Sequence, residues 1–208
     1  MKTLTASLLI LISSTIASIS ADNYISIALP KGVSVLLPKN WKGLSKEQLI
    51  TLDATVQSRL ETTGLYDATH DLLFAANYYD DANKIASKFN IRYYPELDLT
   101  QQDAKEATES DVKELDAALK EILKESLEAF SSSIVEWRGT RKESINSHIA
   151  FVTEYTRSPI QDSGIFCVRL VRLFRGSASY TITVSYRLSD ERLLRPICDK
   201  IIKSINNE

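Results

Sequence analysis

Cysteine, histidine and glycine are scarce in this chain of 208 residues, with two, two and six copies. Because the cysteines and histidines show no ligand spacing, the sequence predicts no metal site. The few glycines and the lack of internal repeats exclude a low-complexity or repetitive protein. No nucleotide-binding or catalytic motif is present either, so we expect no cofactor.

An excess of positive charge is also lacking. The chain has 25 Lys and Arg residues against 27 Asp and Glu residues, a formal net charge of −2. Proteins that bind nucleic acids gather basic side chains that neutralise phosphates. Here the two signs of charge are mixed along the whole chain. We therefore expect no nucleic-acid partner.

The N-terminal residues have the order of a secretory signal peptide. Lys2 precedes an apolar stretch over 4–16, and small residues follow up to Ala21. The stretch is shorter than the roughly 20 apolar residues that span a membrane, and no later segment is long and apolar enough. No cysteine follows it as a lipid anchor. We expect cleavage near Ser20 or Ala21, and one periplasmic or secreted domain over 22–208 without a transmembrane span.

Apolar periodicity divides this domain into strands and helices. It predicts strands at 24–29, 33–37, 72–79, 85–94, 135–140, 145–156, 165–175 and 180–188, and helices over 45–64, 112–130 and 189–205. The acidic segment 95–110 is expected to be a solvated loop, and 141–144 a turn. Proline at 196 is expected to kink or break the last helix. The order β-β-α-β-β-α-β-β-β-β-α predicts an α/β (α+β) fold in which helices cover an antiparallel sheet.

The two cysteines leave two alternatives open. Cys167 and Cys198 meet an oxidising compartment after export, where a pair can close a disulfide. Both lie among apolar residues, so two buried thiols that pack as small hydrophobic side chains explain them equally well. A nucleophilic Cys167 with His148 as its base is disfavoured, because an apolar setting raises the pKa of a thiol.

A few other side chains are candidates for contacts with ligands or partners. A pocket on the last four strands would gather His148, Tyr155 and Arg169. Trp41 and Trp137 supply the aromatic area that anchors protein interfaces. Alternation within the strand 165–175 places Arg172 on the face opposite Arg169.

Two short motifs carry a resemblance to a known family. The segments Ile27–Gly32 and Leu37–Trp41, together with Ile145–Ala150 and the order of the elements, resemble the PsbP-like superfamily. That superfamily includes the extrinsic PsbP subunit of photosystem II and a Ran release factor. The resemblance implies an α/β/α sandwich that serves mostly as an accessory or binding module, and it assigns no functional residue here.

Two functional hypotheses follow. The first is an exported, non-enzymatic accessory protein that binds another envelope protein. The second is a small-ligand binder or enzyme with its site near His148 on the C-terminal strands.

Overall fold

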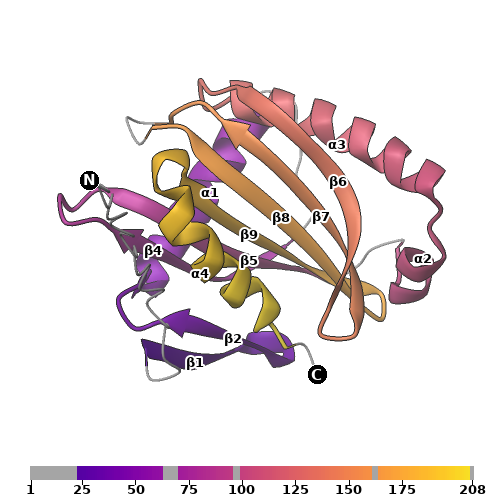
Figure 1. The fold of residues 1–208 in the computed structure, drawn as a ribbon, viewed down its shortest axis with the longest axis horizontal. Coiled ribbons are helices and arrows are strands. Elements are labelled where there is room, and N and C mark those ends of the chain that lie inside the picture. Colours follow the sequence, from indigo (N-terminus) through magenta and orange to yellow (C-terminus); the bar gives the residue numbers. More distant parts are fainter. Residues whose placement is uncertain (1–22, 63–69, 96–98, 161–163, 207–208) are drawn as a thin grey trace, which may run out of the picture.

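One antiparallel sheet forms the centre of the structure (Figure 1). The computed structural model describes residues 23–62, 70–95, 99–160 and 164–206. Within them the sheet runs in the order β3 (Lys42–Gly43), β4 (Asp71–Tyr79), β5 (Ile85–Tyr94), β9 (Ala178–Arg187), β8 (Phe166–Arg175), β7 (His148–Arg157) and β6 (Ile134–Ile145). Each neighbouring pair is antiparallel.

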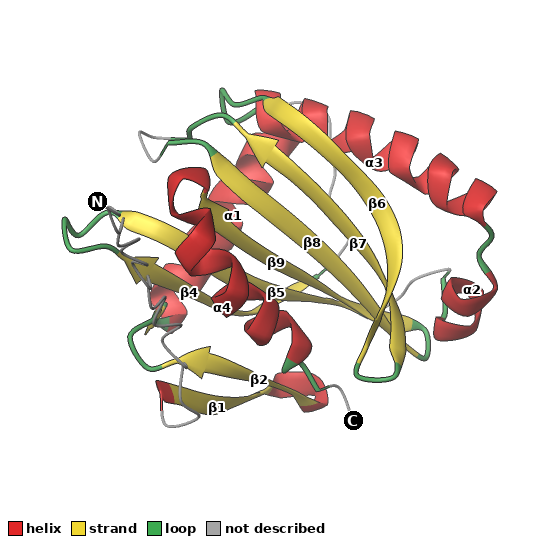
Figure 2. Cartoon of the chain, viewed as in Figure 1, coloured by secondary structure: helices red, strands yellow, loops and turns green. Residues whose placement is uncertain are grey.

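Helices cover both faces of this sheet (Figure 2). One face carries α1 (Lys46–Thr62), α2 (Gln101–Glu106) and α3 (Glu109–Glu128); the other carries α4 (Glu191–Lys203) and a separate hairpin of β1 (Tyr24–Leu29) and β2 (Val33–Pro38). The layers and the order of the main elements are those expected, so the predicted α/β/α sandwich is confirmed.

The main core lies between the sheet and α4. Successive side chains of a strand point to opposite faces, so Val171 and Ile182 of the central strands point toward α4, where they pack with Leu194 and Ile201. On the other face a smaller cluster forms under α3, with Phe166 at its centre. The sheet is therefore buried from both sides, but more completely on the α4 side.

The turn between β6 and β7 lies further along the chain than expected. Strand β6 continues through 141–144, where a turn was predicted, and pairs with β7 as far as Ile145 opposite His148. Asn146 and Ser147 make the turn instead, with φ of 47° and 68°. Two residues at positive φ suit the right-handed twist of a hairpin, and asparagine tolerates that conformation. The polar run 141–144 belongs to β6, which is the edge strand of the sheet. The charge of these residues does not distinguish an edge strand from a turn.

The prediction of a loop over 95–110 was wrong in part, because it holds the short helix α2. Thr100 caps α2: its hydroxyl accepts from the Asp103 backbone N–H at 3.3 Å, and the Asp103 carboxylate accepts from the Thr100 N–H at 2.7 Å. Thr108 and Asp111 repeat the same capping box at the start of α3. Reciprocal pairs at this spacing satisfy two backbone donors at a helix start, so the sequence itself carries the signal for both helix starts.

The last helix differs from the expectation at its start and at its proline. Ser189 lies in a 3₁₀ turn (Leu188–Asp190), and α4 begins at Glu191. Pro196 lies inside α4, which continues unbroken to Lys203. The amphipathic stripe is as predicted, because Leu194, Cys198 and Ile201 are all buried against the sheet.

The expected signal peptide lies outside the described residues. Within the ranges that the structure describes, no helix is both long and apolar enough to cross a membrane.

Candidate functional site

The structure does not bring His148, Tyr155 and Arg169 together. Arg169 lies opposite Glu154 on the α4 face, whereas Tyr155 points to the α3 face. His148 begins β7 beside the turn, far along the strand from both. The Tyr155 ring stacks on Trp137 with 5.9 Å between centroids, and burial raises the pKa of its hydroxyl to about 12. Tyr155 is therefore a core residue of the α3 side.

The two tryptophans make internal contacts. Trp41 is buried and stacks on Tyr78 at 6.2 Å between centroids, so it belongs to the core and not to an outward aromatic surface. The indole N–H of Trp137 donates to both carboxylate oxygens of Asp116, at 3.0 and 3.2 Å. Asp116 therefore holds α3 against β6, because the Thr140 N–H also donates to it, at 2.6 Å.

Both cysteines are free and buried, so the structure shows the second of the two alternatives rather than the disulfide. Burial raises the pKa of Cys198 to about 12, and its sulfur lies 3.6 Å from the Ser87 hydroxyl. Burial also raises the pKa of Cys167, which lies opposite Thr156 and not near His148. Neither thiol is set up as a nucleophile.

We expect thiol-specific alkylation to distinguish these states directly. The native protein should resist labelling at Cys167 and Cys198, because both sulfurs are buried and protonated. After unfolding without a reductant, intact mass should show two labels on each chain. A chain that takes up labels only after reduction would contradict the structure and support a Cys167–Cys198 disulfide.

On the α4 face, an ion-pair network centres on Glu154. This carboxylate is 3% exposed and lies near Arg138 (2.9 Å), Arg169 (3.5 Å), Arg141 (3.7 Å) and Arg195 (3.8 Å). Burial alone would raise the pKa of Glu154, but the hydrogen bond from Arg138 and the charges of the other arginines outweigh it, so the pKa is lowered. Other carboxylates complete the network, as Asp199 does by pairing with Arg169. The expected ligand residue Arg169 is thus already neutralised.

The opposite sheet face has a different charge pattern. In the described chain, the positions of β5, β7, β8 and β9 that face α3 hold five cations and no carboxylate: Lys88, Arg92, Arg157, Arg172 and Arg187. Burial, and the charge of Arg157, lower the pKa of Lys88. Arg187 pairs with Asp80 at 2.7 Å, and Arg92 lies 3.8 Å from Asp53. Among the described residues, Lys88, Arg157 and Arg172 have no carboxylate within ion-pair distance.

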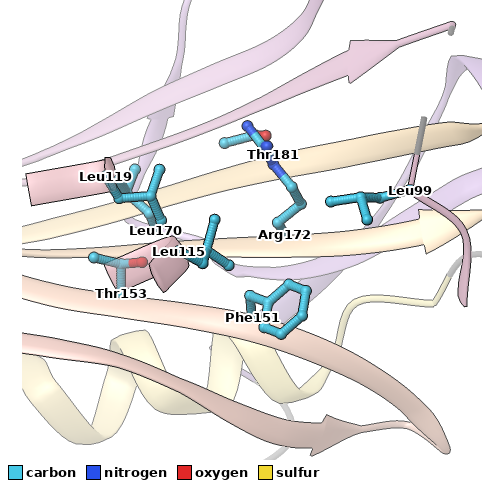
Figure 3. A pocket seen from close by; sticks show the side chains of 8 residues that line it. All are labelled: Leu99, Leu115, Leu119, Phe151, Thr153, Leu170, Arg172 and Thr181. Atoms are coloured by element: carbon cyan, nitrogen blue, oxygen red, sulfur yellow. The ribbon is translucent and has the colours of Figure 1, made fainter. Parts of the chain in front are cut away.

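A small pocket opens on this face beneath α3 (Figure 3). It has a volume of about 50 Å³. Its walls are mainly apolar and its polar groups are few: Leu99, Leu115, Leu119, Phe151 and Leu170 with Thr153, Arg172 and Thr181. Leu115 and Leu119 lie one turn apart on α3, so both reach down toward the strands. Apolar walls with a few polar groups are typical of binding sites.

The sequence correctly predicts that Arg172 lies on the strand face opposite Arg169, but it does not predict this pocket. Arg172 lies directly opposite Thr181 on β9 and Phe151 on β7, a row that only the strand register reveals. The alternation of apolar and polar residues over 180–188 places Thr181 on the polar side of its strand. Helix α3 packs on β6 and leaves space above β8 and β9. This placement depends on tertiary packing, so the sequence pattern does not predict it.

Comparison with known proteins supports the fold and not a function. No protein-family model and no curated protein matches the chain. Among solved structures, cyanobacterial PsbP (CyanoP) from Synechocystis is similar, with 8% identity, a TM-score of 0.57, and coverage of 91% of this chain and 95% of that chain. LpqN of Mycobacterium tuberculosis, described as involved in cell envelope biogenesis, matches at 10% identity with a TM-score of 0.45, over 88% of this chain and 89% of that chain. The likeness to CyanoP shows that the chain has the PsbP-like fold, as the sequence motifs implied.

Proposed function

We propose that this protein is an exported accessory protein that acts by binding another protein of the cell envelope. Export, with cleavage near Ser20 or Ala21, is part of this proposal and rests on the N-terminal pattern of the sequence. The PsbP-like fold favours an accessory role, because the superfamily that the sequence resembles includes a subunit bound to a larger assembly. The observation that carries the proposal is the pocket beneath α3.

The size of this pocket favours a protein partner. Sites for cofactors and other small molecules measure about 300–1,000 Å³, whereas this pocket has a volume of about 50 Å³. One aliphatic side chain of a partner fills such a space, and the surrounding surface supplies the rest of the contact. Leu99, which is 40% exposed at the pocket, is available for that contact.

Site-specific photo-crosslinking in the native host tests the proposal. A benzoylphenylalanine placed at Leu99 should crosslink one envelope protein in near-stoichiometric yield. The same group at Leu193 is the control, because Leu193 is 61% exposed but lies on α4, on the opposite face of the sheet. Efficient crosslinking from Leu193 instead would assign the contact to the α4 face. No product above background from either position would contradict the accessory role.

A further inference from the structure

The geometry points to an aliphatic carboxylate as the group that the pocket beneath α3 recognises, with the hydrocarbon against its leucines and the carboxylate on Arg172. This inference deepens the proposed function, because it names the chemistry that the partner must present. It depends on three features of the pocket within the described ranges: a cation with no carboxylate at ion-pair distance, a hydroxyl with no hydrogen-bond partner, and a small apolar space.

The cation is Arg172. In the part of the chain that the structure describes, no carboxylate lies within ion-pair distance of its guanidinium, whose recorded contact is the Tyr94 ring at 5.9 Å. The neighbouring Arg92 lies 3.8 Å from Asp53 and donates to His70 at 3.2 Å, so it is already engaged. A half-buried guanidinium without an anion is a strong site for one, because its planar fork binds a carboxylate through two parallel hydrogen bonds.

The hydroxyl belongs to Thr181, which lies directly opposite Arg172 in the register of β8 and β9. Its Oγ1 is buried and finds no hydrogen-bond partner among the residues that the structure describes. A buried donor without a partner costs free energy, so an acceptor that reaches it gains more than an ordinary surface contact. Figure 3 shows the Arg172 side chain extending toward Thr181. One carboxylate can accept from both groups.

The apolar space limits the size of the hydrocarbon. Leu115 and Leu119 of α3 stand over Leu170 and Phe151 of the sheet. Since a buried water needs roughly 10–15 Å³, the pocket volume of about 50 Å³ corresponds to a few waters or a short branched chain. Leucine combines such a chain with a carboxylate when it is the last residue of a protein. A free short-chain acid offers the same chemistry.

Matched small probes test the inference by NMR. Isocaproate is leucine without its amino group, and isocaproamide is its neutral analogue of nearly the same shape. We expect isocaproate to shift the backbone signals of Leu115, Phe151 and Thr181 saturably, and the amide to bind about tenfold more weakly, because it lacks the charge that pairs with Arg172. Equal binding of acid and amide, or shifts confined to the α4 face, would overturn the inference.

Two variants separate the arginine from charge in general. Arg172→Gln should weaken isocaproate binding about tenfold and leave the weak binding of the amide unchanged. Arg175→Gln is the matched control, because Arg175 is exposed on the same strand but points to the other face. Thr181→Val, which keeps the side-chain shape, should weaken the binding of isocaproate by a smaller factor than Arg172→Gln does. Loss of binding in Arg175→Gln to the same extent would show a nonspecific charge effect and refute the site.

A peptide arm identifies the source of the carboxylate. An acetylated tripeptide ending in leucine should bind more tightly than isocaproate if the ligand is a protein C-terminus, and its C-terminally amidated form should bind more weakly. Tighter binding of isocaproate than of the tripeptide would instead identify a small carboxylic acid as the ligand. No binding of any of these acids would refute the inference, yet a partner crosslinked from Leu99 would still uphold the proposed function.

Discussion

Replacing Glu154 by alanine is expected to lower the free energy of unfolding by about 3–5 kcal/mol. The carboxylate is 3% exposed and has four arginine side chains within 4.0 Å. Its removal takes away the carboxylate that these four guanidinium groups share, and the charge of Arg169, which is only 7% exposed, is then balanced mainly by Asp199. Breaking a buried ion pair from one side costs more than the pair contributes, because the remaining charge stays desolvated.

Chemical denaturation at neutral pH measures this loss, and a surface pair supplies the control. Glu121 lies 3.9 Å from Lys124 on α3, and both side chains are more than half exposed. Since exposed pairs contribute about 0–1 kcal/mol, Glu121→Ala should change the free energy of unfolding by less than about 1 kcal/mol. Equal losses in the two variants would show that the network around Glu154 is dispensable.

The acid limb of the stability curve tests the same network in the unmodified protein. The pKa of Glu154 is lowered from its ordinary value of 4.5, so the unfolded chain takes up the proton first as the pH falls. Its contribution is therefore fully present above about pH 4.5 and is lost as the pH falls through the lower pKa of the folded state. In Glu154→Gln this part of the pH dependence should disappear, leaving a flatter acid limb.

Local signals in the sequence predicted most of the fold. The alternation over 180–188 is the strand β9, and most of the apolar face of 112–130 is the side of α3 that packs on the sheet, with Leu127 buried and Ile122, at 51% exposed, the exception. In each element one face packs on the core, so its apolar residues recur with the period of a strand or of a helix. That period can be read directly from the sequence. Asn146 shows the limit of this reasoning, because the turn there depends on backbone conformation and not on hydrophobicity.

The pocket and the ion-pair network could not be predicted in the same way. The sequence correctly separated Arg169 from Arg172 by strand alternation. It did not show that one guanidinium meets Glu154 while the other has no carboxylate nearby among the described residues, because that difference depends on strand register and on where α3 and α4 lie. Candidate residues chosen by chemical type alone, such as His148 and Tyr155, therefore do not come together in the structure.

The second large effect is expected for Ile201→Ala in α4. Ile201 is 0% exposed and packs in the core between α4 and the sheet. Deleting three buried carbons removes apolar contact and leaves a cavity, which lowers the free energy of unfolding by about 2–5 kcal/mol. Leu193→Ala is the control within the same helix, because Leu193 is 61% exposed and its truncation should change stability by less than about 0.5 kcal/mol.

Together, Ile201→Ala and Arg172→Gln test whether the two sheet faces have separate roles. Ile201 lies on the α4 face and Arg172 on the α3 face, so the core and the pocket share strands but not side chains. Ile201→Ala should lower the melting temperature by several degrees while its folded fraction binds isocaproate with unchanged affinity. Arg172→Gln should weaken binding and leave the melting temperature nearly unchanged, because Arg172 makes no ion pair with any residue that the structure describes. A variant that changes both properties together would show that the pocket depends on the α4 core.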